Sequence, residues 1–485
     1  MGILSNIEPK EVFHYFEELS MVPRSTFHTK KISDFCVEFA KAHNLEYIQD
    51  EVNNVIIKKP GTAGYENSDP VIIQGHLDMV ATKTTDSDHD FENDPLDLFV
   101  DGDLIGAKNT TLGGDDGIAV AYAMAILASA DIPHPPIEAV FTIDEEIGMG
   151  GAHHLDTSIL KGKICLNIDS EIEGVMTVGC AGGYIYDTFI PIEWSEESGT
   201  KMTISLSNLQ GGHSGDDINK GRGNAIKILN RFLWDLNERY GLLVASLEGG
   251  NLRNAIAREA NAVIVFDEVL KENIRVDFNM YAAEMEEVWK ITEPGLQLEL
   301  ESVDLPGEVL TQEFTNKLLN ALYACPHGVF AMSYRMPGMV ETSTNLAAVK
   351  FIENDTILIT TSQRSDVDSE KMNIAHMVAA VFRLIGAEVE HGEGYPGWAP
   401  NPESAILKIA VESYKQLFGY EPVVRSIHAG LECGLFLEKY PGMDMISFGP
   451  TLRGVHSPDE KVDIETVGKW WKHLVDILER LTKEA

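Results

Sequence analysis

The sequence is poor in cysteine. Its 485 residues include five cysteines, an odd number, widely scattered and without any Cys-x-x-Cys pair. This usage argues against a disulfide framework and favours a reducing, cytoplasmic location. We therefore interpret Cys36, Cys165, Cys180, Cys325 and Cys433 as small core residues.

Basic residues and long apolar runs are also scarce. The chain has 38 Lys and Arg against 76 Asp and Glu, a formal net charge of -38. Such a charge repels phosphate backbones and anionic membrane surfaces, so we predict no nucleic-acid partner. No segment holds 18 uninterrupted apolar residues, and the N-terminal MGILSNIEPKEVF lacks the pattern of a signal peptide. The sequence therefore predicts neither a membrane span nor a secretory leader.

The length and composition predict a globular protein of two or three domains, with 44% hydrophobic and 24% charged residues. Two amphipathic helices, over 5–20 and 26–43, open the chain. Strands over 55–58, 71–74, 136–143 and 164–168 then alternate with a buried, alanine-rich helix over 117–129. This alternation predicts an α/β sheet with a site at its strand ends. Residues 86–103 are expected to form a solvated loop.

The pattern of hydrophobic and polar residues changes after residue 179. Half-buried strands over 184–192 and 202–209 and an amphipathic helix over 224–239 predict a separate α+β domain. A glycine- and proline-rich stretch at 391–402 precedes the return of the α/β pattern. We expect one domain in two parts, 1–182 and 396–485, interrupted by an inserted domain, 183–395.

The stretch FTIDEEIGMGG, at 141–151, ends a predicted strand with three consecutive carboxylates. Adjacent acids repel one another unless they are solvated, protonated or held by cations. A charged strand end is the alternative interpretation. Other possible metal ligands also follow strands or sharp turns, and residues leaving neighbouring strands at one edge converge in space; these are His76, Asp78, Asp115, Asp116 and Asp169.

The spacing His76-x-Asp78 places both side chains on the same side of a strand. Asp78 could then orient the imidazole, as carboxylates beside metal-bound histidines commonly do. A carboxylate shared by two divalent cations needs further N and O ligands and a free acid to act as base. With His456 late in the chain, the residues by themselves indicate a metal hydrolase.

Six motifs in order resemble the di-zinc M20 metallopeptidases: GHLDMV, TLGGDDGIAVA, TIDEEIGMGG, LNIDSE, GGHSGDDI and GVHSPDE. Longer phrases such as GGHSGDDINKGRGNA, NLRNAIAR and HAGLECGLF are similar to the aminoacyl-histidine dipeptidase branch of that family. The resemblance implies an α/β zinc-peptidase catalytic domain interrupted by an α+β lid domain. It also implies two Zn²⁺ ions per chain, which Co²⁺ or Mn²⁺ could replace.

The resemblance also implies roles for individual residues. His76 and Asp169 would complete one zinc site, Glu146 and His456 the other, and Asp115 would bridge both. Three further residues would act in the reaction: Glu145 as general base, Asp78 as orienting carboxylate and His213 as the group that stabilises the oxyanion. Three positions resemble substrate-binding residues, namely Asn254, Arg364 and Gly430, with Ser343 and Asn345 as weaker candidates. Asp116 and Asp144 match no ligand position, and we interpret them as structural.

The implied activity is hydrolysis of dipeptides, preferentially Xaa-His and including β-Ala-His, by a zinc-activated bridging water. A broad-specificity dipeptidase, an amidohydrolase that deacylates N-acyl amino acids and a binding protein that has lost its chemistry are the alternatives. The expected partners are a small peptide and a second copy of the chain. Whether His213 serves its own site or that of a partner subunit stays open.

Overall fold

The computed structural model describes residues 2–196, 199–304, 307–392 and 394–483. The chain forms two compact units. The first comprises 1–179, 400–426 and 431–485, and the second comprises 180–399 and 427–430. The segment 427–430 thus packs with the second unit, although the sequence pattern assigns it to the first. Residue 393, in the glycine- and proline-rich stretch, lies outside the described residues.

The first unit is built on an eight-stranded sheet with the order β1-β2-β6-β3-β7-β21-β8-β20. β3 is parallel to both of its neighbours, β6 and β7, so the carboxyl ends of these three strands lie at one edge. A small four-stranded sheet, β22-β23-β5-β4, completes the unit. The strands are β1 (Glu46–Gln49), β2 (Val55–Lys59), β3 (Val71–His76), β4 (Leu98–Asp101), β5 (Leu104–Ala107), β6 (Ile137–Thr142), β7 (Ile164–Asn167), β8 (Val175–Cys180), β20 (Val423–Ile427), β21 (Asp444–Ser447), β22 (Leu452–Arg453) and β23 (Lys461–Asp463).

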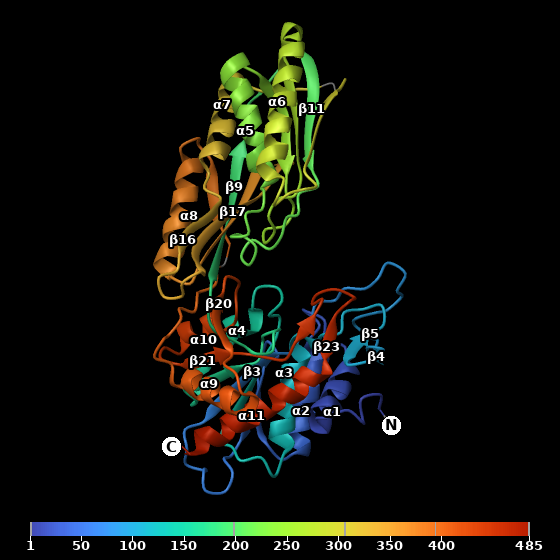
Figure 1. Ribbon diagram of the computed structural model, residues 1–485, viewed down its shortest axis with the longest axis vertical. Helices are drawn as coiled ribbons and strands as arrows, with labels where there is room; N and C mark the ends of the chain where they lie inside the picture. The colour runs from blue at the N-terminus through green and yellow to red at the C-terminus, as the bar shows by residue number, and fades with distance from the viewer. Residues whose placement is uncertain (1, 197–198, 305–306, 393, 484–485) are drawn as a thin grey trace. The chain divides into compact units, whose positions relative to one another are not determined.

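Helices flank this sheet (Figure 1). The alanine-rich helix α3 packs between α1 and β3, which explains why it is apolar on all sides. The structure confirms the two predicted N-terminal helices, the predicted helix that is α3, and the α/β class. The prediction that residues 86–103 form a loop is wrong at its end, because Leu98–Asp101 forms strand β4 and pairs with β5. The helices are α1 (Lys10–Ser20), α2 (Lys30–Ala42), α3 (Gly114–Ala128), α4 (Gly150–His154), α9 (Ala405–Phe418), α10 (Cys433–Lys439) and α11 (Ile464–Lys483).

The second unit contains a nine-stranded, antiparallel sheet whose main path is β14-β11-β13-β12-β17-β18-β9-β19. β16 pairs with the part of β17 that β12 does not reach. The strands are β9 (Gly182–Pro191), β10 (Trp194–Ser195), β11 (Thr200–Ser207), β12 (Leu243–Gly249), β13 (Ala260–Phe266), β14 (Gln297–Ser302), β15 (Val309–Leu310), β16 (Gly328–Met332), β17 (Val340–Ile352), β18 (Thr356–Ser365) and β19 (Glu388–His391).

Four helices of this unit share one hydrophobic core with the sheet, which agrees with their place along it in Figure 1. α5 buries Phe232 and Leu236, α7 buries Leu318 and α8 buries Phe382. The long helix over 271–289 escaped the sequence analysis. The helices are α5 (Ala225–Tyr240), α6 (Lys271–Trp289), α7 (Gln312–Ala324) and α8 (Asp368–Arg383).

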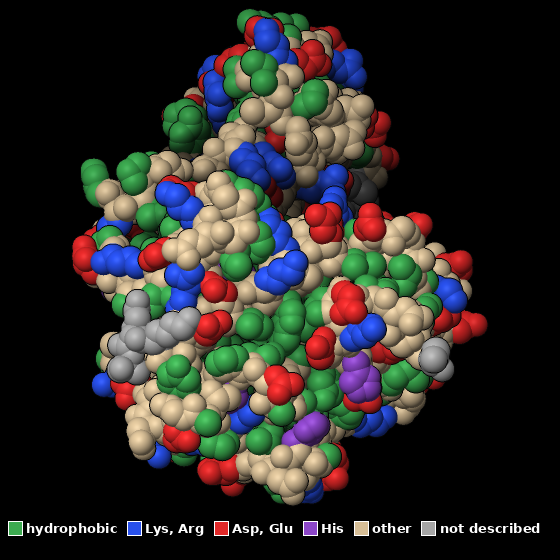
Figure 2. Space-filling model, turned by 60° about the horizontal axis from the view of Figure 1, so that its bottom comes forward, with side chains coloured by type: hydrophobic (Ala, Val, Ile, Leu, Met, Phe, Trp, Pro, Cys, Tyr) green, Lys and Arg blue, Asp and Glu red, His purple; other side chains and the backbone are tan. Residues whose placement is uncertain are grey.

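Two expectations from composition can be compared with the structure. All five cysteines are buried, as predicted for core residues. No helix in the described part of the chain is both long and apolar enough to cross a membrane. On the face shown in Figure 2, acidic, basic and apolar side chains are interspersed.

Candidate metal centre and substrate-binding residues

Strand geometry places the first predicted ligands. His76 is the last residue of β3, and Glu145 and Glu146 follow the end of β6. Asp169 stands two residues beyond β7. Because β3 lies between β6 and β7 and is parallel to both, these side chains leave the sheet at one edge.

His76 is buried and contacts two carboxylates. Its Nε2 lies 3.2 Å from Asp115 Oδ1, and its Nδ1 lies 3.4 Å from Asp78 Oδ1 and 3.1 Å from the Asp78 carbonyl oxygen. Burial disfavours a charged imidazole, but the hydrogen bonds that both carboxylates accept from the ring outweigh this effect and raise the pKa of His76 well above its ordinary value. The carboxylates of Asp115 and Asp78 thus favour positive charge on this imidazole.

Asp78 connects His76 to the turn that carries the acid triplet. Its Oδ1 accepts the backbone N–H of Glu145 at 3.1 Å, and its Oδ2 accepts that of Glu146 at 3.4 Å. Thr26 Oγ1 donates to the same carboxylate at 3.0 Å. One fully buried side chain therefore fixes a histidine and two acids relative to one another.

His456 brings the C-terminal part of the chain into the cluster. Its Nε2 lies 3.3 Å from Asp115 Oδ2 and 3.0 Å from Glu146 Oε2. These two contacts raise the pKa of His456 to about 11. Burial opposes ionisation of Asp115, yet the hydrogen bonds from His456 and His76 lower its pKa. Asp115 thus lies between the two histidines, with one oxygen directed to each.

Glu460 holds the glycine turn that presents Asp115. Its carboxylate accepts the backbone N–H groups of Leu112, Gly113 and Gly114 at 2.8–2.9 Å. Gly113 has a φ of 63°, and a Cβ there would lie 2.5 Å from Arg24 Nη2. Glu460 was not predicted from the sequence, although it stands only four residues after His456 and would have been a candidate for that reason.

Two groups of side chains could each hold a cation, and they share His76. Their ligand atoms lie within 4.8 Å of one another in His76, Asp115 and Glu146 and in His76, Asp116 and Asp169. Asp116, interpreted as structural from the sequence, therefore lies in the cluster, and its Oδ2 accepts the backbone N–H of His76 at 3.2 Å. The strand-end pattern had listed Asp115 and Asp116 together as possible ligands, and the structure brings both side chains to the cluster.

The acids of this cluster are crowded. Burial, followed by the charge of Asp169, raises the pKa of Glu145 well above its usual range. Burial and the charge of Asp115 do the same to Asp169. Glu146 Oε1 is buried without a hydrogen-bond partner. Unpaired carboxylate oxygens beside imidazole nitrogens form a donor set that suits divalent cations such as Zn²⁺, so the residues present fit a metal site.

Asp144 differs from its two neighbours. It has a φ of 53°, and its Oδ1 accepts the backbone N–H of Phe27 at 2.8 Å. It belongs to neither group of possible ligands found among the described residues. This agrees with its interpretation as a structural residue of the turn.

The remaining predicted residues, His213, Asn254, Arg364 and Gly430, belong to the second unit. His213 Nδ1 accepts the backbone N–H groups of Gly215 at 3.3 Å and Asp216 at 3.2 Å. Burial, with the nearby charge of Arg364, lowers the pKa of His213. A neutral ring whose Nδ1 accepts hydrogen bonds carries its proton on Nε2.

Arg364 is 7% exposed and forms no ion pair with any acid among the described residues. Its Nη1 donates to Tyr395 Oη at 2.9 Å, and its Nη2 lies 3.4 Å from Ser214 Oγ and from His213 Nε2. A surface ion pair, the alternative interpretation of this arginine from the sequence, is therefore wrong. Part of the guanidinium's hydrogen-bonding capacity is available for an anion.

Gly215 allows the loop of His213 to approach another part of the unit. A Cβ at Gly215 would lie 1.9 Å from the carbonyl oxygen of His428, two residues before Gly430. The carbonyl of Asn254 accepts the backbone N–H of Ser214 at 2.8 Å. Asn254 thus borders the His213 loop, and the loop also approaches the chain two residues before Gly430. The weaker candidate Ser343 forms a 2.7 Å hydrogen bond with His428 Nε2.

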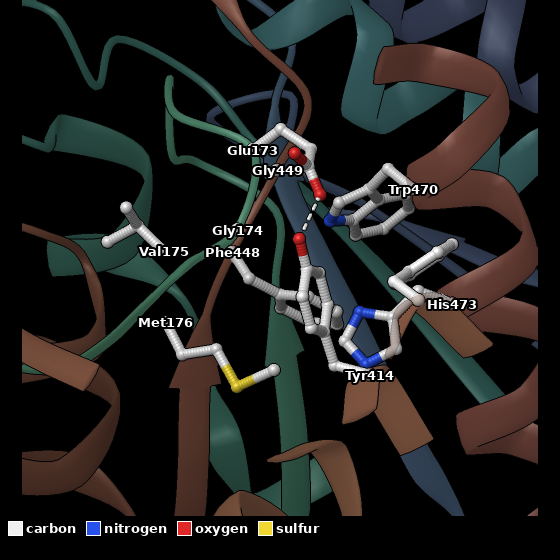
Figure 3. A pocket seen from close by; sticks show the side chains of 10 residues that line it. Glu173, Gly174, Val175, Met176, Tyr414, Phe448, Gly449, Trp470 and His473 are labelled. Carbon is white, nitrogen blue, oxygen red and sulfur yellow. Dashed lines mark hydrogen bonds between the residues drawn. The ribbon is translucent and has the colours of Figure 1, made fainter. Parts of the chain in front are cut away.

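A separate pocket of the first unit contains none of the predicted site residues (Figure 3). In it the Tyr414 hydroxyl donates to Glu173 at 2.6 Å, and Lys469 pairs with the same carboxylate at 2.8 Å. Lys469 also lies over the rings of Tyr414, Phe418 and Tyr420. The polar groups of Tyr414, Glu173 and Lys469 satisfy one another, so we interpret these three residues as structural.

The first unit carries a cluster of histidines and carboxylates at the carboxyl edge of its α/β sheet. In the chain, this unit is interrupted by the second unit, which is α+β. This arrangement is that of a metal-dependent hydrolase. The chain belongs to the peptidase family M20/M25/M40, whose sequence pattern it matches over residues 72–480. The predicted family is confirmed.

Two relatives are similar along their full length. The chain is 38% identical over 483 residues to the cytosol non-specific dipeptidase of Escherichia coli K12, covering 99% of each sequence. The crystal structure of aminoacylhistidine dipeptidase from Vibrio alginolyticus matches with a TM-score of 0.89 and 39% identity over 98% of both chains. The aminopeptidase PepT from Bacillus cereus, at 15% identity and a TM-score of 0.56 with 98% of this chain covered and 99% of its own, shares the fold.

Proposed function

We propose that the protein is a dinuclear metal dipeptidase that prefers Xaa-His substrates, including β-Ala-His. The observation that carries the proposal is the contact of Asp115 with both His76 and His456, beside two groups of possible ligands that each include His76. His76 with Asp169 and Glu146 with His456 would hold one Zn²⁺ ion each, and Asp115 would bridge them. Bound zinc supplies Lewis-acid activation of a water molecule near neutral pH.

Glu145 is the proposed general base. It is next to a ligand but makes no side-chain hydrogen bond to a ligand among the described residues, so its carboxylate can take a proton from the attacking water and return it to the leaving amine. Asp78 fixes the Glu145 backbone and thereby the starting point of that side chain. A ligand and a base on consecutive residues keep proton transfer close to the bond that breaks.

His213 and Arg364, whose side-chain nitrogens lie 3.4 Å apart, are proposed to bind two neighbouring groups of the peptide. The proton on His213 Nε2 would stabilise the oxyanion that forms from the scissile carbonyl. The buried Arg364 guanidinium would bind the C-terminal carboxylate, for which its planar geometry is suited. Asn254 and Gly430 would line the same substrate-binding region of the second unit.

The Xaa-His preference rests on similarity to the Vibrio protein, and the name of the Escherichia coli relative favours a broad-specificity dipeptidase as the second candidate. Hydrolysis of β-Ala-His, other Xaa-His dipeptides, Xaa-Leu dipeptides and N-acetyl amino acids would be compared with metal analysis of the same sample. Higher kcat/KM for Xaa-His supports the proposal. Comparable rates for all dipeptides select the second candidate, and turnover of acyl amino acids alone contradicts both.

We also propose a cytosolic location and a homodimer. The edge strand β16 and the turn after it carry exposed apolar side chains, Val329, Phe330, Met332 and Tyr334, which a second copy could cover. Light scattering would give the mass. Mixing His213→Ala chains with Glu145→Gln chains tests the source of the histidine, since recovered activity would assign His213 to the partner's site.

A further inference from the structure

A layer of buried polar side chains lies within the sheet, two residues before the proposed ligands His76 and Asp169 along their strands. Gln74 precedes His76 by two residues and Asn167 precedes Asp169 by two, and strand residues two apart point to the same side. Gln74 is opposite Asn167 in the β3–β7 register. Thr142 is opposite His76 in the β3–β6 register. The three strands therefore support the ligands with polar groups, although apolar residues fill most of the strand interiors.

Glu432 joins this layer from a different part of the chain. It is fully buried and directly precedes α10, to whose N–H groups its side chain makes no capping hydrogen bond. Its Oε2 accepts hydrogen bonds from Gln74 Nε2 and from Thr142 Oγ1, each at 2.6 Å. Gln74 Oε1 in turn accepts a hydrogen bond from Asn167 Nδ2 at 2.5 Å. One carboxylate thus connects the ends of β3, β6 and β7.

The charge of Glu432 has no partner in the described chain, where no Lys or Arg forms an ion pair with it. Its Oε1 is buried without a hydrogen-bond partner. Burial raises the pKa of Glu432 to about 7, although the hydrogen bond from Thr142 and the positive charge of His76 act against this. An unpaired buried carboxylate is costly, and a neutral amide could accept the same two hydrogen bonds. A negative charge on Glu432 would therefore be stabilised by cations bound nearby.

We propose that Glu432 is a positioning residue of the metal centre, which holds the ends of three ligand-bearing strands together and supplies buried negative charge that favours divalent cations. The inference rests on the proposed function, because it presupposes the metal centre. It adds a role that acts through Gln74, Thr142 and Asn167 and not by direct coordination.

The test is a titration of the metal-free protein with Zn²⁺ and, separately, with Co²⁺. Glu432→Gln keeps an oxygen for Gln74 and Thr142 but removes the charge. We expect it to bind Zn²⁺ about 10- to 100-fold more weakly, the usual effect of losing a group that supports metal ligands, while the metal-free protein keeps its Tm. Glu432→Leu also removes the hydrogen bonds, and should change the Co²⁺ absorption spectrum, which reports ligand geometry.

Glu138 offers a matched control. It is also a buried carboxylate of the same sheet, but at the opposite end of β6, where it pairs with Lys58 at 3.2 Å and accepts the backbone N–H of Gly162 at 2.9 Å. Glu138→Gln should lower the Tm and leave Zn²⁺ affinity unchanged. If Glu432→Leu does not fold, Thr142→Val removes one of the two donors at similar volume and should weaken Zn²⁺ binding by a smaller factor.

The inference is overturned if Glu432→Gln binds Zn²⁺ within about twofold of the parent protein, well below the loss expected for a supporting residue. It is also overturned if Glu138→Gln weakens binding as much, since burial of any carboxylate would then explain the effect. A parent protein that binds no divalent cation, or cleaves no dipeptide with metal bound, would contradict the proposed function instead.

Discussion

His76 and Asp78 contact each other from the end of one strand, with 3.4 Å between His76 Nδ1 and Asp78 Oδ1. The same carboxylate accepts the backbone N–H of Glu145. Asp78 therefore sets the orientation of a proposed ligand and the position of the proposed base at once. This double role distinguishes it from the other acids of the cluster and leads to a first prediction.

Asp78→Ala should lower Zn²⁺ affinity about 10- to 100-fold, because the imidazole loses the group that orients it. Atomic spectroscopy after dialysis against a chelator measures the metal retained. Asp144→Asn is the matched control, because Asp144 accepts one backbone N–H and lies in neither possible ligand group. Equal metal loss in both variants would contradict a specific role for Asp78.

Glu145→Gln should lower kcat by a factor of about 100 to 10,000, the usual contribution of a general base, and leave the metal bound. Glu146→Gln should instead lose metal, because Glu146 contacts His456 within the cluster. Steady-state rates and metal content of both variants would be measured together. Near-normal turnover in Glu145→Gln would exclude it as the base.

His456→Ala should lower the metal content, and full occupancy in this variant would remove His456 from the proposed ligands. The variant also tests a pH effect in the metal-free protein. The folded pKa of His456, about 11, lies above its ordinary value of 6.5. Its contribution to stability is therefore complete below about pH 6.5 and is lost as the pH rises toward 11.

The measurement is the Tm of metal-free parent and His456→Ala proteins at several pH values between neutral and alkaline. We expect the parent to lose its advantage over the variant steadily as the pH rises. A difference in Tm that stays constant over this range would show that the contacts with Asp115 and Glu146 do not favour the charged imidazole.

Arg364→Met should raise KM and lower kcat/KM about 10- to 100-fold for dipeptides with a free C-terminal carboxylate, since a hydrogen bond to a charged group contributes about 1.5–3 kcal/mol. Dipeptide amides should be affected far less. Arg231→Met is the control, because that side chain is exposed and pairs with Glu284 on the surface. An equal loss for acids and amides would contradict carboxylate binding by Arg364.

Gly215→Ala should destabilise the second unit by about 1–3 kcal/mol, the usual cost of inserting a methyl group into a packed site. The Cβ would meet the carbonyl oxygen of His428, and the displaced loop would move His213. Chemical denaturation and kcat would be measured. Gly392→Ala provides the control, because nothing lies within 4 Å of a Cβ there.

Short sequence motifs were sufficient to predict the edge of the sheet at which the possible metal ligands lie. An apolar strand followed by His76-x-Asp78, and another followed by the acid triplet, already indicate where the side chains emerge, because side-chain alternation in a strand is fixed. The structure confirms that His76, Asp115, Glu146 and His456 lie in contact. Their roles in binding and catalysis remain predictions.

Residues that act through long-range contacts could not be predicted in this way. Glu460 holds the turn before Asp115 from 345 positions away in sequence, and Glu432 reaches Gln74 across 358. Its position four residues after His456 makes Glu460 a candidate, but the local sequence of neither residue reports which distant groups it contacts. The helix over 271–289 was also not predicted. Its polar and apolar residues are only weakly separated onto two faces, and only four of its residues are buried.

The assignment of residues 427–430 to the second unit has a consequence for how the chain can be divided. The backbone passes between the two units four times, at 179–180, 399–400, 426–427 and 430–431. A fragment limited to residues 180–399 would lack the carbonyl groups of Ile427 and Ala429, which accept the N–H of Ala181. A version of the inserted domain that is expressed alone, or grafted onto a relative, would thus need residues 427–430 in addition to the contiguous segment 180–399.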